Sequence, residues 1–354
     1  MPSDIRFVGW DIGGAHLKVA MLDADGSLCD VKTCATPLWE GTTVLVEALN
    51  EVRMAHDLED VCHAVTMTGE LADIFTDRAA GVRALLELFS GCFPRSPIGI
   101  YAGVRGFLNP EAAMRAFEFV ASANWHATAC LAARCYAKGL LVDVGSTTTD
   151  LAWFQDGRVR TRGSSDRTRL AIGELVYTGV VRTPVMALAS AVPFRGLWVD
   201  LAAEHFATTA DVYRISGELP PDADLGRTAD GREKSRTASE ARLARMLGTD
   251  ASDGSTAMWR SVADYLAECQ IQRLTRACQL QISRGIEVDT PLVGVGIGRF
   301  LVERIARRLG RTYQVYDPLA GFSEIGSGAT VGADMGPALA VALLMREVVR
   351  TCAF

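Results

Sequence analysis

The sequence has neither paired cysteines nor an apolar run long enough to cross a bilayer. No two of its nine cysteines are spaced as Cys-x-x-Cys, and the count is odd. We therefore expect no structural zinc site. We expect instead that the cysteines are free thiols, buried in a protein of a reducing compartment. The apolar stretch Ala338–Met345 is far shorter than the roughly 20 residues that a membrane-spanning helix needs. Because the sequence passes from Met1 almost directly into an apolar strand pattern, we expect no secretory signal and a cytoplasmic location.

A strong excess of positive charge is also lacking. The formal net charge is −6, and no run of lysine or arginine follows one face of a predicted element, so nucleic-acid binding is not expected. With 354 residues, of which 49% are hydrophobic, the chain is long enough for two domains with a substantial core. No feature of the sequence sets the oligomeric state.

Short apolar runs and longer amphipathic runs follow one another along the chain and predict a mixture of strands and helices. The predicted strands span residues 5–10, 17–22, 28–33, 61–68, 98–101, 139–143, 151–154, 291–298 and 313–315. The predicted helices span residues 42–55, 79–89, 110–121, 124–138, 239–247, 257–282, 300–309 and 337–349. Residues 219–256 are rich in Asp, Arg, Gly and Ser and predict an exposed polar insertion.

The first predicted strand ends in a glycine-rich turn. The segment Asp11–Lys18 reads Asp-Ile-Gly-Gly-Ala-His-Leu-Lys. Gly13 and Gly14 have no side chain to keep an anion away from the main-chain N–H groups, and Lys18 adds a positive charge, so the turn is a candidate phosphate loop. Asp11, at the end of the strand, is a candidate ligand of Mg²⁺. A plain hairpin explains the same residues equally well.

A similar unit recurs about 130 residues later, where Asp143–Asp150 reads Asp-Val-Gly-Ser-Thr-Thr-Thr-Asp after another apolar strand. Asp143 is the second candidate ligand of Mg²⁺. Candidate phosphate donors are the main chain of Gly145 and the hydroxyl groups of Ser146, Thr147, Thr148 and Thr149. A repeat over this distance predicts a duplicated domain, and two such turns can bind one phosphate chain from opposite sides of a cleft.

A third glycine-rich segment lies between a predicted strand and a predicted helix. Its glycines, Gly294, Gly296 and Gly298, are candidates for binding a nucleotide or another phosphate near the helix N-terminus. A dinucleotide-binding unit carries an acidic residue about 20 residues further on. Asp317 is the nearest candidate, and the missing early position of the motif argues against a dinucleotide site.

Together, the three segments in this order resemble the actin-like ATPase superfamily, which includes sugar and acetate kinases, heat-shock ATPases and hydantoinase/oxoprolinase proteins. The resemblance covers nearly the whole chain. It implies an α/β fold of two duplicated actin-like (ribonuclease H-like) domains flanking a cleft. The first domain is expected to comprise residues 1–138 and the C-terminal helix 337–354, and the second residues 139–336 with the polar insertion at about 219–256.

Other segments resemble a narrower group within the hydantoinase/oxoprolinase branch. Besides the first turn, they are Met67–Asp73, Ala123–Thr128, Gly173–Gly179, Arg182–Val185 and Thr228–Gly231. The group consists of proteins linked to tetrahydromethanopterin-dependent one-carbon transfer, and it includes the enzyme of methanofuran biosynthesis that forms a furan–tyramine ether. The resemblance implies a transferase that joins an (aminomethyl)furanylmethyl diphosphate to the phenol of a tyramine or tyrosine derivative and releases pyrophosphate. The two turns would then bind the diphosphate with Mg²⁺.

Such a reaction needs stabilisation of the departing diphosphate and a base for the phenol, whose ordinary pKa is about 10. Asp150, Glu70 and His16 are the candidate bases, and the sequence does not choose among them. Asn124 stands where sugar kinases of the superfamily carry a catalytic aspartate. An amide cannot act as a base, so this position argues against a sugar kinase.

Three further residues are candidates for binding the organic substrate. Arg182 has apolar neighbours in the sequence and can bind a substrate carboxylate with two parallel hydrogen bonds. Trp125 and His126 can line an aromatic pocket, although core packing explains Trp125 as well.

Two other functions fit the same motifs. One is an ATP-dependent kinase or hydantoinase-type ATPase, in which ATP takes the place of the diphosphate substrate. The other is a non-catalytic regulator that binds a nucleotide. Asn124 argues against the first, and the intact acidic and hydroxyl residues of both turns argue against the second. The sequence does not say which phenol is used or whether ATP binds.

Overall fold

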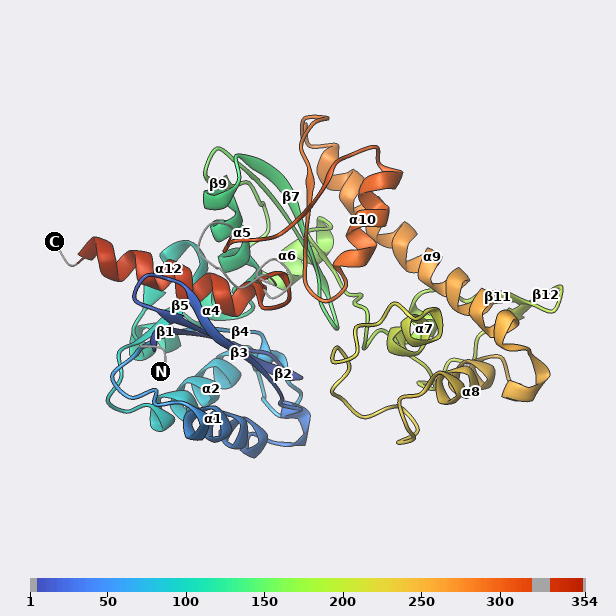
Figure 1. The fold of residues 1–354 in the computed structure, drawn as a ribbon, viewed down its shortest axis with the longest axis horizontal. Helices are drawn as coiled ribbons and strands as arrows, with labels where there is room; N and C mark the ends of the chain where they lie inside the picture. Colours follow the sequence, from blue (N-terminus) through green and yellow to red (C-terminus); the bar gives the residue numbers. More distant parts are fainter. Residues whose placement is uncertain (1–4, 320–331, 353–354) are drawn as a thin grey trace. The chain divides into compact units, whose positions relative to one another are not determined.

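The computed structural model describes residues 5–319 and 332–352 (Figure 1). The chain divides into two compact units. Unit 1 is Met1–Gly139, Ala152–Arg169 and Val315–Phe354, and unit 2 is Leu140–Leu151 and Leu170–Gln314. The sequence-based division placed Gly139 and residues 152–169, 315–319 and 332–336 in the second domain, whereas the structure groups them with unit 1.

The sheet of unit 1 combines an antiparallel meander with parallel strands. Its strands are β1 (Ile5–Ile12), β2 (His16–Asp23), β3 (Leu28–Ala35), β4 (Cys62–Met67), β5 (Ile98–Tyr101) and β6 (Phe107–Leu108), in the order β3-β2-β1-β4-β5-β6. β1, β2 and β3 pair antiparallel, β4 lies parallel to β1, and β5 lies parallel to β4. Because β1 and β4 run in the same direction, the residues that follow both strands meet at one edge of the sheet.

Helices cover both faces of this sheet (Figure 1). The helices and 3₁₀ turns up to the second sheet are η1 (Leu38–Glu40), α1 (Thr43–Ala55), η2 (Gly69–Leu71), α2 (Arg78–Cys92), η3 (Gly103–Arg105), α3 (Pro110–Arg115), α4 (Phe117–Val120) and α5 (Asn124–Cys135). The last helix of the chain is α12 (Gly336–Cys352). α1 and α2 lie on one face of the sheet, and α12 lies on the other against β1, β2 and β4. The single helix predicted for residues 110–121 is broken into α3 and α4 at Ala116.

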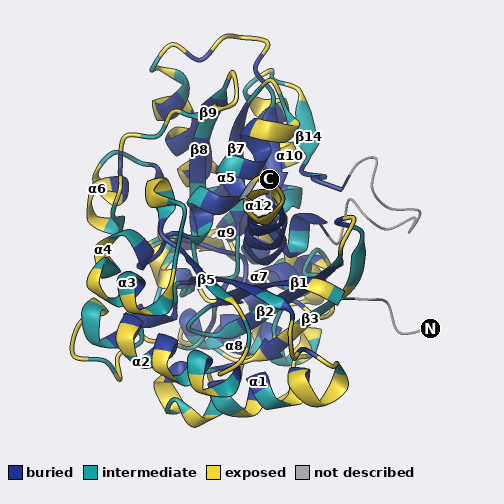
Figure 2. Ribbon diagram, turned by 90° about the vertical axis from the view of Figure 1, so that its left-hand side faces the viewer, coloured by how far each residue is buried: buried dark blue, intermediate teal, exposed yellow. Residues whose placement is uncertain are grey.

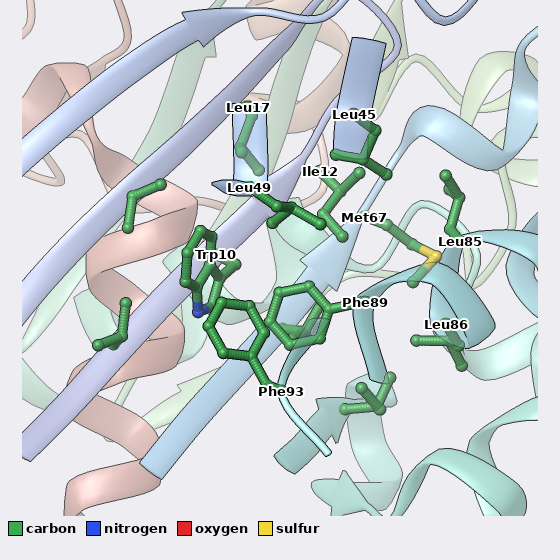
Figure 3. Close-up of a cluster of buried hydrophobic side chains, with 14 of the residues drawn as sticks. Trp10, Ile12, Leu17, Leu45, Leu49, Met67, Leu85, Leu86, Phe89 and Phe93 are labelled. Carbon is green, nitrogen blue, oxygen red and sulfur yellow. The ribbon is translucent and has the colours of Figure 1, made fainter. Parts of the chain in front are cut away.

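The core of unit 1 fills the space between the sheet and helices α1 and α2. Figure 3 shows side chains of β1 packed against leucines of α1 and against leucines and a phenylalanine of α2; the labelled residues include Trp10, Ile12, Leu45, Leu49, Leu85 and Phe89. Buried and exposed residues alternate along α1 (Figure 2), as expected of a helix with one face on a core. The indole Nε1 of Trp10 donates to Nδ1 of His63 at 3.0 Å, so the buried polar atom of this large side chain is satisfied.

On its opposite face, β1 comes very close to α12 at Gly9. A Cβ at this position would lie 1.9 Å from the main-chain oxygen of Ala338 and 2.9 Å from the Cβ of Ala342. The apolar helix therefore packs directly on the strand backbone, which only glycine permits.

Gly9→Ala is expected to lower the free energy of unfolding by about 2 kcal/mol or more, because α12 has to move away from the sheet and its buried residues lose contacts. Urea unfolding of the variant and the wild type measures the difference. Gly91→Ala in α2 is the matched control, since a Cβ there meets no described atom within 4 Å. Equal stability of Gly9→Ala and wild type would contradict the close approach.

The second sheet repeats the strand order of the first. Its strands are β7 (Lys138–Val144), β8 (Thr149–Gln155), β9 (Arg158–Val159), β10 (Leu175–Val176), β13 (Leu292–Val295) and β14 (Tyr313–Val315). The order is β10-β8-β7-β13-β14, with β9 paired to β8. With β7 in the place of β1, this matches β3-β2-β1-β4-β5 strand by strand, and the parallel pair β13–β7 corresponds to β4–β1. The sequence repeat predicts such a duplication.

A long insertion separates β10 from β13 in unit 2. Its elements are η4 (Val185–Ala187), the hairpin β11 (Ala191–Phe194) and β12 (Leu197–Asp200), α7 (Thr209–Ser216), α8 (Arg236–Met246), η5 (Ala251–Asp253) and α9 (Thr256–Ile282). The helix α6 (Asp166–Ala171) precedes β10, and α10 (Arg299–Arg308) follows β13. The polar segment 219–256 is not uniformly exposed, because the side chain of Arg242 is fully buried and contacts Asp211 and Asp230. Within the part of the chain that the structure describes, no helix is long and apolar enough to span a membrane.

Candidate active site

The first turn is closed by its own main chain. The N–H of Gly13 donates to the main-chain oxygen of His16 at 2.9 Å, and Asp11 pairs with Lys18 across β1 and β2. A Cβ on Gly13 would lie 2.8 Å from the oxygen of His16, so the turn requires glycine. A Cβ on Gly14 would meet no described atom within 4 Å. The Cβ side of Gly14 is therefore open, while its main-chain oxygen accepts a hydrogen bond from the N–H of Leu38 at 3.0 Å.

The side chains of the first turn have different surroundings. Asp11 is buried at the end of β1, and His16 is half-buried at the start of β2. The ammonium group of Lys18 donates to the main-chain oxygen of Asp334 at 2.7 Å. Lys18 therefore binds the segment that precedes α12, and it would have to exchange this hydrogen bond to bind a phosphate.

The second turn closes in the same way as the first. The N–H of Gly145 donates to the main-chain oxygen of Thr148 at 2.9 Å. Asp143 occupies the position in β7 that Asp11 occupies in β1, two residues before the glycine that closes the turn. Asp150 lies in β8 opposite Leu175 of β10 and is half-buried.

The four hydroxyl side chains of the second turn are not equivalent. Thr149 is fully buried, and its hydroxyl donates to the main-chain oxygen of Thr178 at 2.7 Å. The other three residues, Ser146, Thr147 and Thr148, are half-buried. These three hydroxyls therefore remain as candidate phosphate donors of the turn.

Main-chain hydrogen bonds hold the segment Thr178–Thr183 to the second turn. The N–H of Val180 donates to the oxygen of Gly145 at 3.0 Å, and the N–H of Arg182 donates to the oxygen of Ser146 at 2.9 Å. The side chain of Arg182 is exposed although its neighbours in the chain are buried. The structure thus fixes Arg182 beside the second turn, where a charged substrate group can reach it.

A buried polar network supports this segment from α7 and α9. Nε2 of Gln270 donates to the hydroxyl of Thr178 and to the main-chain oxygen of Gly179, both at 2.8 Å. The hydroxyl of Tyr213 donates to Oε1 of the same glutamine. Gln270 was missed by sequence reasoning, because a glutamine within a long amphipathic helix gives no sign of its partners. The only sequence feature that pointed to this network was the segment Gly173–Gly179, which carries part of the family resemblance.

Gly294, within β13, and Gly296 and Gly298, which follow it, serve close packing within unit 2. A Cβ at Gly294 would collide with the ring of Tyr313, and a Cβ at Gly298 with side chains of Val144 and Val180. Gly296 has a φ of +81°, and a Cβ there would lie 2.5 Å from Oδ1 of Asp143. All three are buried. Gly294 leaves room for the ring of Tyr313, whereas Gly296 and Gly298 allow a close approach to Asp143 and Val144 of β7.

Asn124, Trp125 and His126 begin α5 and have partners within unit 1. Oδ1 of Asn124 accepts a hydrogen bond from the N–H of Trp125 at 2.8 Å. The guanidinium of Arg169 lies 3.7 Å from the centre of the Trp125 ring. Nδ1 of His126 lies 2.8 Å from the hydroxyl of Tyr101, and burial lowers the pKa of His126 to about 4. Arg169 itself is only 1% exposed.

Glu70 is the candidate base that is most removed from water. It is 1% exposed in η2, directly after β4. The hydroxyl oxygen of Ser122 lies 2.9 Å from Oε1 of Glu70 and 3.1 Å from Oδ2 of Asp166. Burial, together with the charge of Asp166, raises the pKa of Glu70 to about 7, against the lowering effect of the Ser122 hydrogen bond. Ser122 and Asp166 were missed from sequence, because both are distant in the chain from Glu70.

The segment that carries Glu70 packs on the first turn. The N–H of Thr68 donates to the main-chain oxygen of Ile12 at 3.0 Å. A Cβ on Gly69 would lie 3.1 Å from the same oxygen. Unit 1 therefore brings together the first turn and Glu70, and unit 2 brings together Asp143, the second turn and Arg182.

The two aspartates at the strand ends have the chemistry that Mg²⁺ requires. Mg²⁺ is usually bound by one or two carboxylates together with substrate phosphate oxygens and water. Among the described residues there is no group of three or more His, Cys, Asp or Glu arranged around a metal position. Asp11 and Asp143 each end a strand beside an anion-binding turn, so each fits a magnesium ion that is shared with a bound phosphate.

Comparisons with known proteins identify the family of the chain. Residues 62–331 match the family model of hydantoinase/oxoprolinase. The chain is 33% identical over 247 residues to a Methanocaldococcus jannaschii protein named (4-{4-[2-(gamma-L-glutamylamino)ethyl]phenoxymethyl}furan-2-yl)methanamine synthase, covering 70% of this chain and 72% of that protein. A protein of the same name from Methanococcus vannielii is 32% identical over 111 residues, which cover 31% of this chain and 50% of that protein.

A solved structure extends the comparison to the fold. The nucleotide-free structure of acetone carboxylase superposes with a TM-score of 0.57 at 11% identity, covering 87% of this chain and 68% of that one. This likeness concerns the fold alone. The duplicated sheets have the α/β architecture of the actin-like ATPase superfamily. The chain is an enzyme of the transferase type, and it belongs to the hydantoinase/oxoprolinase family.

Proposed function

We propose that this enzyme forms a phenoxymethyl–furan ether in methanofuran or methylofuran biosynthesis. Its substrates would be an (aminomethyl)furanylmethyl diphosphate and the phenol of a tyramine or tyrosine derivative, and pyrophosphate would be released. The proposal depends on the match to the Methanocaldococcus synthase, whose name describes a product with a phenoxymethyl group on a furan. The presence of a phosphate-type turn in each unit supports it, because the reaction has a diphosphate leaving group.

The residues of the turns suit the departure of a diphosphate. A new bond forms between the phenol oxygen and the furanylmethyl carbon, while the bond from that carbon to the diphosphate oxygen breaks and the diphosphate keeps the electron pair. Main-chain N–H groups and hydroxyls of the second turn, such as those of Ser146 and Thr147, would donate to the diphosphate oxygens as their charge grows. Mg²⁺ bound at Asp11 or Asp143 would supply additional positive charge.

Arg182 is the candidate for recognising the rest of the substrate. Its main chain is bonded to the second turn, while its side chain is exposed. A guanidinium in this place can bind a carboxylate of a tyrosine or glutamyl group through two parallel hydrogen bonds.

The direct test supplies a furanylmethyl diphosphate with tyramine or tyrosine and measures pyrophosphate. Wild-type enzyme is expected to release pyrophosphate only when the phenol is present and to stop when Mg²⁺ is chelated. Asp143→Asn is expected to reduce kcat by roughly 100-fold or more, because the charge that holds Mg²⁺ is lost. Asp222→Asn, at an exposed aspartate of unit 2, is the matched control and should remain active.

A parallel assay with ATP and Mg²⁺ separates this proposal from the alternatives. Phosphate release from ATP that a sugar or an organic acid stimulates, with no phenol-dependent pyrophosphate, would overturn the ether synthase in favour of a kinase or ATPase. Binding of nucleotide without turnover of either substrate would indicate a regulator.

A further inference from the structure

Two carboxyl groups of unit 1 share one serine hydroxyl. Oγ of Ser122 is within hydrogen-bonding distance of both Oε1 of Glu70 and Oδ2 of Asp166. A serine hydroxyl has one proton to donate, and an ionised carboxylate has none. Two full hydrogen bonds form at this hydroxyl when one of the two carboxyls is protonated and donates to Oγ. The arrangement can therefore accommodate one proton more than two ionised carboxylates with a serine.

The backbone holds the hydroxyl in this position. Ser122 has a φ of +52°, which is uncommon for a residue with a side chain and costs energy that the surrounding structure has to offset. Glu70 is fixed from the other side, since a Cβ on Gly81 of α2 would lie 2.4 Å from its main-chain oxygen. Strained and closely packed residues of this kind are frequent at functional sites.

The three residues differ in their access to solvent. Glu70 is buried, and its Oε2 is a buried atom with no hydrogen-bond partner among the described residues. Asp166 is half-buried in the first turn of α6. A proton accepted at Asp166 can therefore pass through Ser122 to a carboxyl that water does not reach. Asp166 is also the charged group that acts on Glu70, whereas Arg169, on the same short helix, lies over Trp125.

We propose that Asp166, Ser122 and Glu70 form a proton relay that removes the phenolic proton during ether formation. The inference rests on the proposed function. In the form that starts the reaction, both carboxyls are ionised and the Ser122 hydroxyl donates to Glu70. As the phenol oxygen bonds to the furanylmethyl carbon, its proton moves to Asp166. The proton of Asp166 then passes to Oγ of Ser122 while the Ser122 proton passes to Glu70. After the ether has left, the same transfers run in reverse, and Asp166 releases the proton to water.

This assignment adds a base that the sequence did not offer, because in the proposed relay Asp166 takes the phenolic proton. Of the three candidates from the sequence, Glu70 keeps a role as the final proton acceptor, and it acts through Ser122 and Asp166. The relay also connects two segments that carry part of the family resemblance. Met67–Asp73 contains Glu70, and Ala123–Thr128 begins directly after Ser122.

The test compares pH–rate profiles of wild type, Glu70→Gln, Ser122→Ala and Asp166→Asn. Wild-type kcat is expected to rise with pH through about 7, the pKa of Glu70. In Glu70→Gln and Asp166→Asn this rise should disappear, and kcat at pH 8 should fall by about 100-fold, the lower end of the usual range for general base catalysis. Ser122→Ala should lose the same rise, because the relay is interrupted between its ends. The control is Glu118→Gln, at an exposed glutamate of the same unit.

A second substrate separates proton transfer from a structural role. A fluorinated phenol gives up its proton more readily, so the loss of rate in Glu70→Gln and Asp166→Asn should be much smaller with it. An equal loss with both phenols and an unchanged pH profile would show that the carboxyls only support the fold, and the relay would be wrong while the ether synthase remained correct.

Infrared spectroscopy tests the relay even if no ether is formed. Wild type should show the band of a protonated carboxyl that is lost on raising the pH through about 7 and that is missing in Glu70→Gln at every pH. Wild type that releases no pyrophosphate but shows this band would overturn the proposed function and leave the proton-sharing group intact. Absence of the band in wild type at pH 5 would overturn the relay.

Discussion

Replacing Gly179 by alanine is expected to remove nearly all activity from an enzyme that still folds. The added Cβ would lie 2.4 Å from the carbonyl carbon of Ser146, 2.5 Å from the nitrogen of Thr147 and 2.6 Å from the oxygen of Gly145. All three are main-chain atoms of the second turn, so no side chain can rotate to make room. The turn has to move by roughly 1 Å, and a displacement of this size can cost about 100-fold in rate.

The loss should appear in both kcat/KM for phenol-dependent pyrophosphate release and the affinity for pyrophosphate, because the same N–H groups and hydroxyls serve binding and catalysis. Circular dichroism and thermal unfolding check that the variant is folded, although overpacking is expected to lower its stability by about 1–3 kcal/mol. Gly226→Ala is the matched control in unit 2, since a Cβ there meets no described atom within 4 Å. A fully active Gly179→Ala enzyme would show that the second turn does not bind the diphosphate.

The fold was predictable from the sequence because the same strand–turn–strand pattern occurs in it twice. Asp11-Ile12-Gly13 and Asp143-Val144-Gly145 each end an apolar strand and open a turn that a single N–H to C=O bond closes at 2.9 Å. Such turns depend on local residues, above all on the glycine, and so they can be read from a short stretch of chain. The helices and strands around them also follow from periodicity, as with α9, whose observed start at Thr256 differs by one residue from the predicted one.

The contacts of individual side chains were not predictable, because they depend on partners far along the chain. Lys18 and Thr149 were assigned to phosphate on the basis of their turns, but the structure gives them hydrogen bonds to the main-chain oxygens of Asp334 and Thr178. Conversely, Ser122 is an unremarkable serine in the sequence. It becomes important only because residues 52 and 44 positions away place carboxyl groups on either side of its hydroxyl.

In the polar insertion, too, the sequence does not reveal which charged side chains are buried. Its arginines and aspartates suggest a solvated loop, yet Arg242 of α8 is completely buried. Its Nη1 contacts Oδ1 of Asp211 and its Nε contacts Oδ1 of Asp230, both at 2.8 Å. Nη2 donates to the main-chain oxygen of Glu233 at 2.7 Å. The segment Thr228–Gly231, which contributes to the family resemblance, thus supplies an anchor for the insertion through Asp230.

Replacing Arg242 by methionine is accordingly expected to destabilise unit 2 by about 3–5 kcal/mol, the usual cost of removing one partner from a buried ion pair. Methionine fills much of the volume of the arginine, but Asp211 and Asp230 lose their shared cation, and the main chain around Glu233 loses a donor. Urea unfolding at pH 7, followed by tryptophan fluorescence, measures the difference. Arg236→Met on the same helix is the control: Arg236 is 46% exposed and pairs with Glu240 at 3.2 Å, so its loss should cost less than about 1 kcal/mol.

The pH dependence of the free energy of unfolding of Arg242→Met distinguishes the loss of an ion pair from the loss of packing. Burial alone would raise the pKa of Asp230, but the hydrogen bonds from Arg242 and from the main chain of Arg232, together with the charges of Arg242 and Arg245, lower it overall. A carboxyl whose pKa is lowered by folding stabilises the protein above its unfolded pKa, and this stabilisation is lost as the pH falls through its folded pKa. Wild type should therefore lose stability on acidification below about pH 4, near the ordinary pKa of aspartate, and Arg242→Met should lose less over the same range. If the free energy of unfolding fell with pH equally in both proteins, Arg242 would contribute mainly by filling space. The ion pairs with Asp211 and Asp230 would then not explain why the insertion contains a buried arginine.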